Sequence, residues 1–61
     1  MVKQGDRVYV DSVFIKGKGT VFYVEHGTFY PIAVLLDEPP FEDGHTLYRF
    51  ETYEVKKIEE D

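Results

Sequence analysis

The sequence predicts an all-β domain of five short antiparallel strands. Turn signals recur along the chain at 17–19, 26–27, 39–40 and 43–44, where Gly, Pro and Asp interrupt the apolar pattern. The stretches between these turns are short and rich in Val, Ile, Tyr, Phe and Thr, which favour strands. No long window spaces its apolar side chains at the helical period of about 3.6 residues. Short strands separated by such turns are typical of a small barrel or sandwich.

The first strand is predicted at 6–10, where apolar and polar sides alternate. Val8 and Val10 point to one face, and Arg7 and Tyr9 point to the other. Similar segments predict the remaining strands at 20–25, 30–37, 46–50 and 55–59. The inward-facing side chains of these strands form the predicted core: Val8, Val10, Val21, Val24, Ile32, Val34, Leu36, Tyr48, Phe50, Val55 and Ile58.

The connections between the strands differ in character. Residues 11–18 are too many and too mixed for a tight turn, so they are predicted as a long loop whose apolar triplet 13–15 folds back on the sheet edge. Residues 51–53 predict a single 3₁₀ turn before the last strand, and 59–61 predict a frayed acidic end. The inward phase of the strand at 20–25 stays open, because two adjacent aromatic residues compete for it and a bulge would place both partly inside.

Five segments, taken in order, carry a resemblance to a known fold: 5–10 (GDRVYV), 17–21 (GKGTV), 30–37 (YPIAVLLD), 48–50 (YRF) and 53–55 (YEV). The chain resembles the small SH3-like barrels, in particular the KOW and Tudor-like modules and short proteins of that shape from phage and Firmicute genomes. The resemblance covers nearly the whole chain and implies an SH3-like barrel of five short antiparallel strands with one 3₁₀ turn before the last. It implies no single function, because such barrels bind RNA, DNA, peptides or methylated side chains.

Composition excludes several classes of protein. Sixty-one residues give room for a single domain, 1–61, with little interior to spare for a cavity. No cysteine is present to form a disulfide or a thiolate zinc site, and ten aromatic side chains are too many for intrinsic disorder. The sequence has neither a membrane-length apolar run nor a signal-peptide pattern, so a cytoplasmic location is expected. Seven basic against twelve acidic side chains give a net charge of −5.

Catalysis and metal binding find little support in the residue pattern. The only serine, Ser12, lies in a loop, and no nucleophilic triad is predicted around it. Gly17 and Gly19 flank a lysine, but the spacing of a phosphate-binding loop is absent, so we interpret them as turn glycines. His26 and His45 would hold a metal only if two loop tips met, and solvated side chains are the simpler interpretation. We therefore expect no enzyme activity, small-molecule substrate, cofactor or metal.

The strongest functional signal is a surplus of apolar side chains. A domain of this size encloses only about eight to twelve side chains, which the predicted core already supplies. If the first, third and fourth strands are neighbours, Tyr9, Leu35 and Leu47 form an outward stripe edged by Arg7 and Arg49, a surface suited to a protein partner or a second copy. The alternative is that the first loop or a chain end covers this face. The large apolar side chains left outside the predicted core are Tyr9, Phe14, Phe22, Phe29, Tyr30, Leu35, Phe41 and Leu47.

Two other binding functions stay open. The resemblance to KOW modules implies nucleic-acid binding, with Arg7, Lys16, Lys18 and Arg49 as the candidate contacts to phosphate. The acidic net charge opposes this function. The third function is an acidic mimic of nucleic acid, which blocks a basic site on another protein through the acids at 42–43 and at the C-terminal end.

Overall fold

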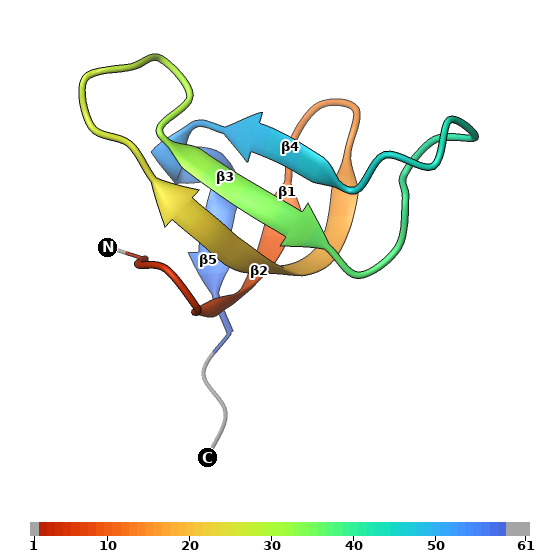
Figure 1. The fold of residues 1–61 in the computed structure, drawn as a ribbon, viewed down its shortest axis with the longest axis horizontal. Coiled ribbons are helices and arrows are strands. Elements are labelled where there is room, and N and C mark those ends of the chain that lie inside the picture. The colour runs from red at the N-terminus through yellow and green to blue at the C-terminus, as the bar shows by residue number, and fades with distance from the viewer. Residues whose placement is uncertain (1, 59–61) are drawn as a thin grey trace.

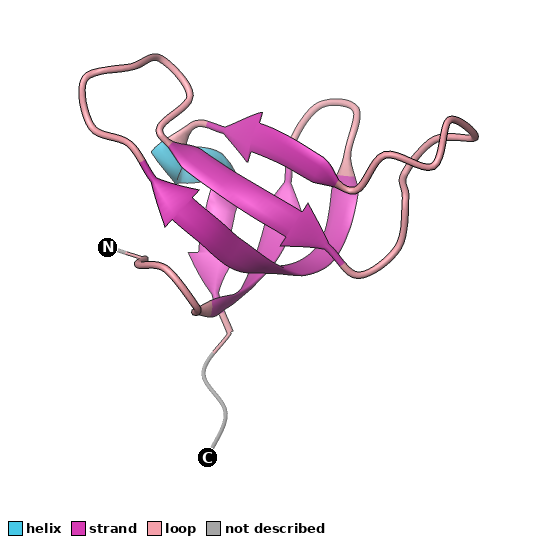
Figure 2. Ribbon diagram, in the orientation of Figure 1, coloured by secondary structure: helices cyan, strands magenta, loops and turns pink. Residues whose placement is uncertain are grey.

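The computed structural model describes residues 2–58, so the predicted frayed end at 59–61 lies outside the described residues. Over residues 2–58 the chain folds into five strands and one short 3₁₀ helix, connected by loops and turns (Figure 1, Figure 2). The element boundaries match the predicted ones within two residues, except at the start of the second strand. In chain order the elements are β1 (Arg7–Asp11), β2 (Lys16–Val24), β3 (Ile32–Leu36), β4 (Leu47–Phe50), η1 (Thr52–Glu54) and β5 (Val55–Lys57).

All the strands pair antiparallel in one sheet, in the order β4-β3-β2-β1-β5. This confirms the predicted all-β class and the 3₁₀ turn before the last strand. Figure 1 shows β1 and β5 lying behind β2, β3 and β4, so the sheet curves over onto itself around the core. Among the described strands, β4 and β5 each pair on one side only, so the hydrogen-bonded sheet keeps two edges.

The alternation of the strands places most of the predicted core inside, and Val2, Ile15 and Ala33 are buried in addition. Val8 and Val10 of β1 are fully buried, and burial of such a side chain stabilises the fold by about 1.5–3 kcal/mol. Val24, Tyr48 and Ile58 were predicted in the core and are only partly buried. The remaining buried apolar side chains are Val2, Ile15, Val21, Ile32, Ala33, Val34, Leu36, Phe50 and Val55.

The connection after β1 is a tight hairpin, and the predicted long loop is wrong. Lys16 opens β2 and pairs with Asp11, so four residues connect the two strands. Ser12 closes this turn, because its backbone N–H and its hydroxyl both donate to the Ile15 carbonyl oxygen, at 2.9 and 3.0 Å. The Ile15 N–H donates in return to the Ser12 hydroxyl oxygen at 3.0 Å. Of the apolar triplet 13–15, only Ile15 packs inside.

Gly17 and Gly19 lie inside β2, so their interpretation as turn glycines is also wrong. Gly19 is buried against β3, where a Cβ would stand 2.5 Å from the Leu35 carbonyl oxygen and 2.8 Å from Val34 Cγ1. A Cβ at Gly17 would meet nothing within 4 Å. The close approach of β2 and β3 therefore requires glycine at 19 and leaves position 17 free to vary.

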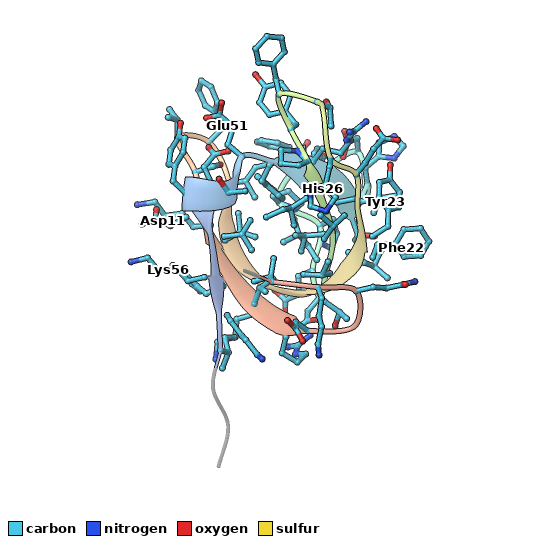
Figure 3. All side chains as sticks on the ribbon, turned by 90° about the vertical axis from the view of Figure 1, so that its left-hand side faces the viewer. Asp11, Phe22, Tyr23, His26, Glu51 and Lys56 are labelled. Atoms are coloured by element: carbon cyan, nitrogen blue, oxygen red, sulfur yellow. The ribbon has the colours of Figure 1, made fainter. Side chains whose placement is uncertain are left out.

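A bulge interrupts the pairing of β2 with β3. Val21 pairs with Val34 and Tyr23 pairs with Ala33, which leaves Phe22 as the extra residue. The sequence raised a bulge as the arrangement that would place both aromatic rings partly inside. The bulge is present, but Phe22 and Tyr23 both point outward, with their ring centroids 5.8 Å apart (Figure 3).

Candidate binding surface

The predicted partner surface on the strands is only partly assembled. Leu35 and Leu47 are direct register partners on β3 and β4, and they are 43% and 46% exposed. Phe22 and Tyr23 lie on the same outward side of the neighbouring β2. Tyr9 does not join this group, because β2 lies between β1 and β3. We call Phe22, Tyr23, Leu35 and Leu47 the strand face.

Arg7, predicted to edge this surface, is engaged within the domain. Its guanidinium donates to both carboxylate oxygens of Asp37, at 2.8 and 2.6 Å, and to the Thr20 hydroxyl at 3.0 Å. These charge-assisted bonds favour the ionised carboxyl, so they hold the pKa of Asp37 below its ordinary value. Any partner that binds Arg7 has to compete with Asp37 for the guanidinium.

Arg49, predicted at the other edge, is engaged as well. It donates to the Tyr30 carbonyl oxygen and to the Glu25 carboxylate, both at 3.0 Å, and its guanidinium carbon lies 6.0 Å from the Tyr23 ring centroid. Ala33 sits between its register partners Arg49 and Tyr23 and is fully buried. The outward side of β3 is thus covered at its start by side chains of the neighbouring strands β2 and β4, which differs from the predicted cover by the first loop or a chain end, and it is open at Leu35.

The most exposed apolar side chains gather at one end of the molecule. The β1–β2 hairpin, η1 and the end of the β2–β3 loop line one hollow there, and Figure 1 shows these segments on the same upper side of the molecule. These segments carry five large apolar side chains, which we call the aromatic end. They are Val13 (85% exposed), Phe14 (84%), Phe29 (87%), Tyr30 (53%) and Tyr53 (76%). By comparison, no side chain of the strand face is more than half exposed.

Hydrogen bonds within the domain fix the loops that carry the aromatic end. The Ser12 bonds close the β1–β2 hairpin and hold its tip outward. Arg49 ties β4 to the β2–β3 loop through Glu25 and a loop carbonyl. The Glu25 N–H donates to the Pro31 carbonyl oxygen at 2.7 Å, which closes that loop at its base, and Gly27 takes the positive φ of 87° that its turn requires. The backbone that carries the exposed side chains is therefore held by hydrogen bonds, which lowers the conformational entropy lost when a ligand binds.

η1 places Tyr53 beside two carboxylates. The Glu51 N–H donates to Glu54 Oε1 at 2.9 Å, and the Glu54 N–H donates to the Glu51 carbonyl oxygen at 3.0 Å. A hydrogen bond between the Tyr53 hydroxyl and the Glu51 side chain, together with the nearby negative charge, raises the pKa of Tyr53 above its ordinary value. Tyr53 therefore remains a neutral phenol at physiological pH.

An open hollow of about 310 Å³ lies between these elements. Small-molecule pockets usually measure about 300–1,000 Å³ and enclose their ligand, so an open hollow at the lower limit suits one or two side chains of a partner. The side chains of the aromatic end that line it are Val13, Phe14, Tyr30 and Tyr53, joined by Ser12, Ile15, Arg49, Phe50, Glu51 and Glu54.

Tyr9 lies in a separate, basic row on β2, β1 and β5. It pairs in register with Lys18 on one side and Lys56 on the other. Within the described part of the chain, neither lysine forms an ion pair, whereas Lys16 lies 3.6 Å from the Asp11 carboxylate. Three of the four residues predicted to contact nucleic acid therefore lie on the adjoining strands β1 and β2. They are Arg7, Lys16 and Lys18. Arg49 lies two strands away on β4.

The two histidines stand at different ends of β3, one in the loop before it and the other in the loop after it. Among residues 2–58, no three His, Cys, Asp or Glu side chains come together as metal ligands would. No helix in this range is long and apolar enough to cross a membrane. No protein-family model and no curated protein matches the sequence.

Proposed function

We propose that this chain is a non-enzymatic, SH3-like binding module that docks on another protein through the aromatic end. The observation that carries the proposal is the exposure of Val13, Phe14 and Phe29, each more than four-fifths open to solvent. Large exposed apolar patches mark partner surfaces, and aromatic residues are frequent anchors there. The class of function is the one the sequence predicts, and a cytoplasmic location belongs to the same proposal. We place the docking surface at the aromatic end, whereas the sequence predicted it on the strands.

The shape of this end favours an extended segment of the partner chain. The hollow is open, and three separate segments of the domain surround it. A segment that crosses it places one or two side chains between Phe14, Tyr30 and Tyr53 while its backbone stays near the surface. The strand face is less exposed, and the Arg49 guanidinium carbon lies 6.0 Å from the centroid of its Tyr23 ring.

A selection experiment with a defined readout tests this proposal. A random peptide library is panned on the domain without any fixed residue, and the selected peptides are added to the ¹⁵N-labelled domain. We expect amide shifts at 13–14, 29–30 and 51–54. Shifts centred on 35 and 47 instead, or a library that yields no binder, would contradict docking at the aromatic end. The double variant Leu35→Ser/Leu47→Ser serves as the matched control, because it removes two apolar side chains from the strand face only.

A second candidate function rests on the register of the basic row. Tyr9 stands between Lys18 and Lys56, so a nucleobase stacked on its ring would have a lysine on each side for the backbone phosphates. Binding of a fluorescent twelve-nucleotide dT strand at low and high salt tests this function. Affinity that falls steeply with salt and that is lost in Tyr9→Ala/Lys18→Gln would support it. Equal affinity in that variant would exclude the basic row as the site.

A further inference from the structure

We infer that the segment bound at the aromatic end carries a lysine or arginine side chain, whose cation lies against the Tyr53 ring and the carboxylates of Glu51 and Glu54. This inference rests on the proposed function, because it names the chemistry of the segment that docks there.

The charges around the hollow do not balance. Glu51 and Glu54 both line it. The cation in the described lining is Arg49, and its guanidinium is already paired with Glu25 at 3.0 Å. An apolar partner would therefore leave two carboxylates beside the contact without a counter-charge, which carries a desolvation cost. A cationic side chain removes that cost.

The base of the hairpin next to the hollow adds no net charge. Lys16 and Asp11 lie opposite each other at the start of β2 and the end of β1, with Nζ 3.6 Å from Oδ1. Glu51 and Glu54 thus remain the uncompensated charges among the described residues that line the hollow. The net charge of the whole chain, −5, has the same sign and would draw a basic segment toward the domain.

Both carboxylates keep acceptor capacity while they hold η1 together. An ionised carboxylate offers about four acceptor sites. Among the described hydrogen bonds, one carboxylate site of Glu54 is used, by the Glu51 N–H at 2.9 Å. An ammonium or guanidinium group can therefore bind the remaining sites without breaking the turn.

The rings complete a site for a cation on an apolar stem. Tyr53 is 76% exposed and Tyr30 is 53% exposed, and aromatic faces attract ammonium and guanidinium groups. The aliphatic part of the lysine or arginine side chain then packs on Val13 and Phe14 of the hairpin tip. The ligand class is therefore a basic residue with apolar neighbours in an extended chain.

The experiment compares two blocked peptides that differ only in charge. The probes are Ac-Leu-Ala-Arg-Ala-Leu-NH₂ and the same peptide with citrulline in place of arginine, which keeps the shape and removes the charge. We expect the arginine peptide to shift amides at 13–14, 30 and 51–54 and to bind at least about tenfold more tightly than the citrulline peptide. This difference should shrink when salt is raised from 20 mM to 500 mM.

Charge-neutralising variants of the domain provide the second arm. Glu51→Gln and Glu54→Gln keep an oxygen acceptor for the bonds within η1, so the fold is retained, and each should weaken the arginine peptide several-fold. Glu42→Gln, in the β3–β4 loop, is the matched control and should leave the affinity unchanged. If Glu42→Gln weakened binding as much, a general attraction to an acidic domain would replace the site inferred here.

The failures of the inference and of the proposed function are distinguishable. Equal affinity for the arginine and citrulline peptides, or no shift at the aromatic end with either, overturns the inference. The unbiased library then decides the proposed function separately, because neutral peptides selected at the aromatic end would still support docking there. A library that yields no binder at this end overturns both.

Discussion

The substitution Gly19→Ala tests how β2 and β3 come together. A Cβ at this position would stand 2.5 Å from the Leu35 carbonyl oxygen, 2.8 Å from Val34 Cγ1 and 3.0 Å from Leu36 Cα. Two of these three atoms belong to the backbone and cannot rotate away. The alanine variant must therefore push the two strands apart at the centre of the sheet.

The size of the effect follows from two opposing contributions. Overpacking a filled core costs about 1–3 kcal/mol of unfolding free energy. Replacing glycine by alanine at an unstrained position stabilises by about 0.4–1 kcal/mol, because the unfolded chain becomes less flexible. Gly17→Ala, in the same strand with nothing near the new Cβ, isolates the second contribution. We expect Gly19→Ala to be less stable than Gly17→Ala by about 1–3 kcal/mol.

Urea unfolding followed by tyrosine fluorescence measures this difference, and thermal melting provides a second readout. In a domain of this size, 1 kcal/mol corresponds to about 4–8 °C in melting temperature. If the two alanine variants unfolded at the same urea concentration, β2 and β3 would not approach as closely as the structure has them. The assignment of glycine at 19 to strand packing would then be wrong.

Three further predictions address the core, the ion pair and the hairpin. Ile32→Val should lower the free energy of unfolding in urea by about 0.5–1.5 kcal/mol. Leu35→Val, on the exposed side of the same strand, should change it by less than about 0.5 kcal/mol. Equal losses of stability in the two variants would contradict the assignment of Ile32 to the buried face and Leu35 to the exposed face. The pKa of Asp37 is lowered in the folded state, so the stability it contributes is complete above its ordinary value of 3.8 and is lost as the pH falls through the lowered pKa. Arg7→Gln should return that pKa toward its ordinary range in a carboxyl NMR titration, and an unchanged pKa would dismiss Arg7 as the cause. Ser12→Ala removes both side-chain bonds of the β1–β2 turn and should cost about 1 kcal/mol in urea unfolding, whereas no loss would mean that this turn needs no side-chain closure.

Local patterns in the sequence were sufficient to predict the fold class and most of the core. Alternation in β1 identified Val8 and Val10 as buried, because the period of a strand is fixed at two. The length of the hairpin after β1 was not predictable in the same way. It depends on the hydrogen bonds by which Ser12 closes the turn, and these require a specific turn geometry. It also depends on the close approach of Gly19 to β3, which is a contact between residues distant in the sequence.

The candidate site was harder to predict, because it depends on how loops meet in space. Phe14, Phe29 and Tyr30 were recognised as surplus to the core, but nothing in the sequence showed that they lie at one end with η1. Tyr9 and Leu35 were placed together on the condition that their strands are neighbours, and β2 separates those strands. The composition does not show ion pairing either: Arg7 and Arg49 were predicted to be open to a partner, and both are bound at the surface to carboxylates of the domain itself.

The affinity of one selected peptide for two matched double variants tests docking at the aromatic end most directly. Phe14→Ser/Tyr53→Ser removes two rings from that end, and Leu35→Ser/Leu47→Ser removes two apolar side chains from the strand face. Both pairs are exposed, so both variants should fold as the wild type does. We predict that the first variant loses at least about tenfold in affinity, as expected when anchor residues are removed, and that the second stays close to wild type. The reverse order would contradict the account and return the docking surface to the strands.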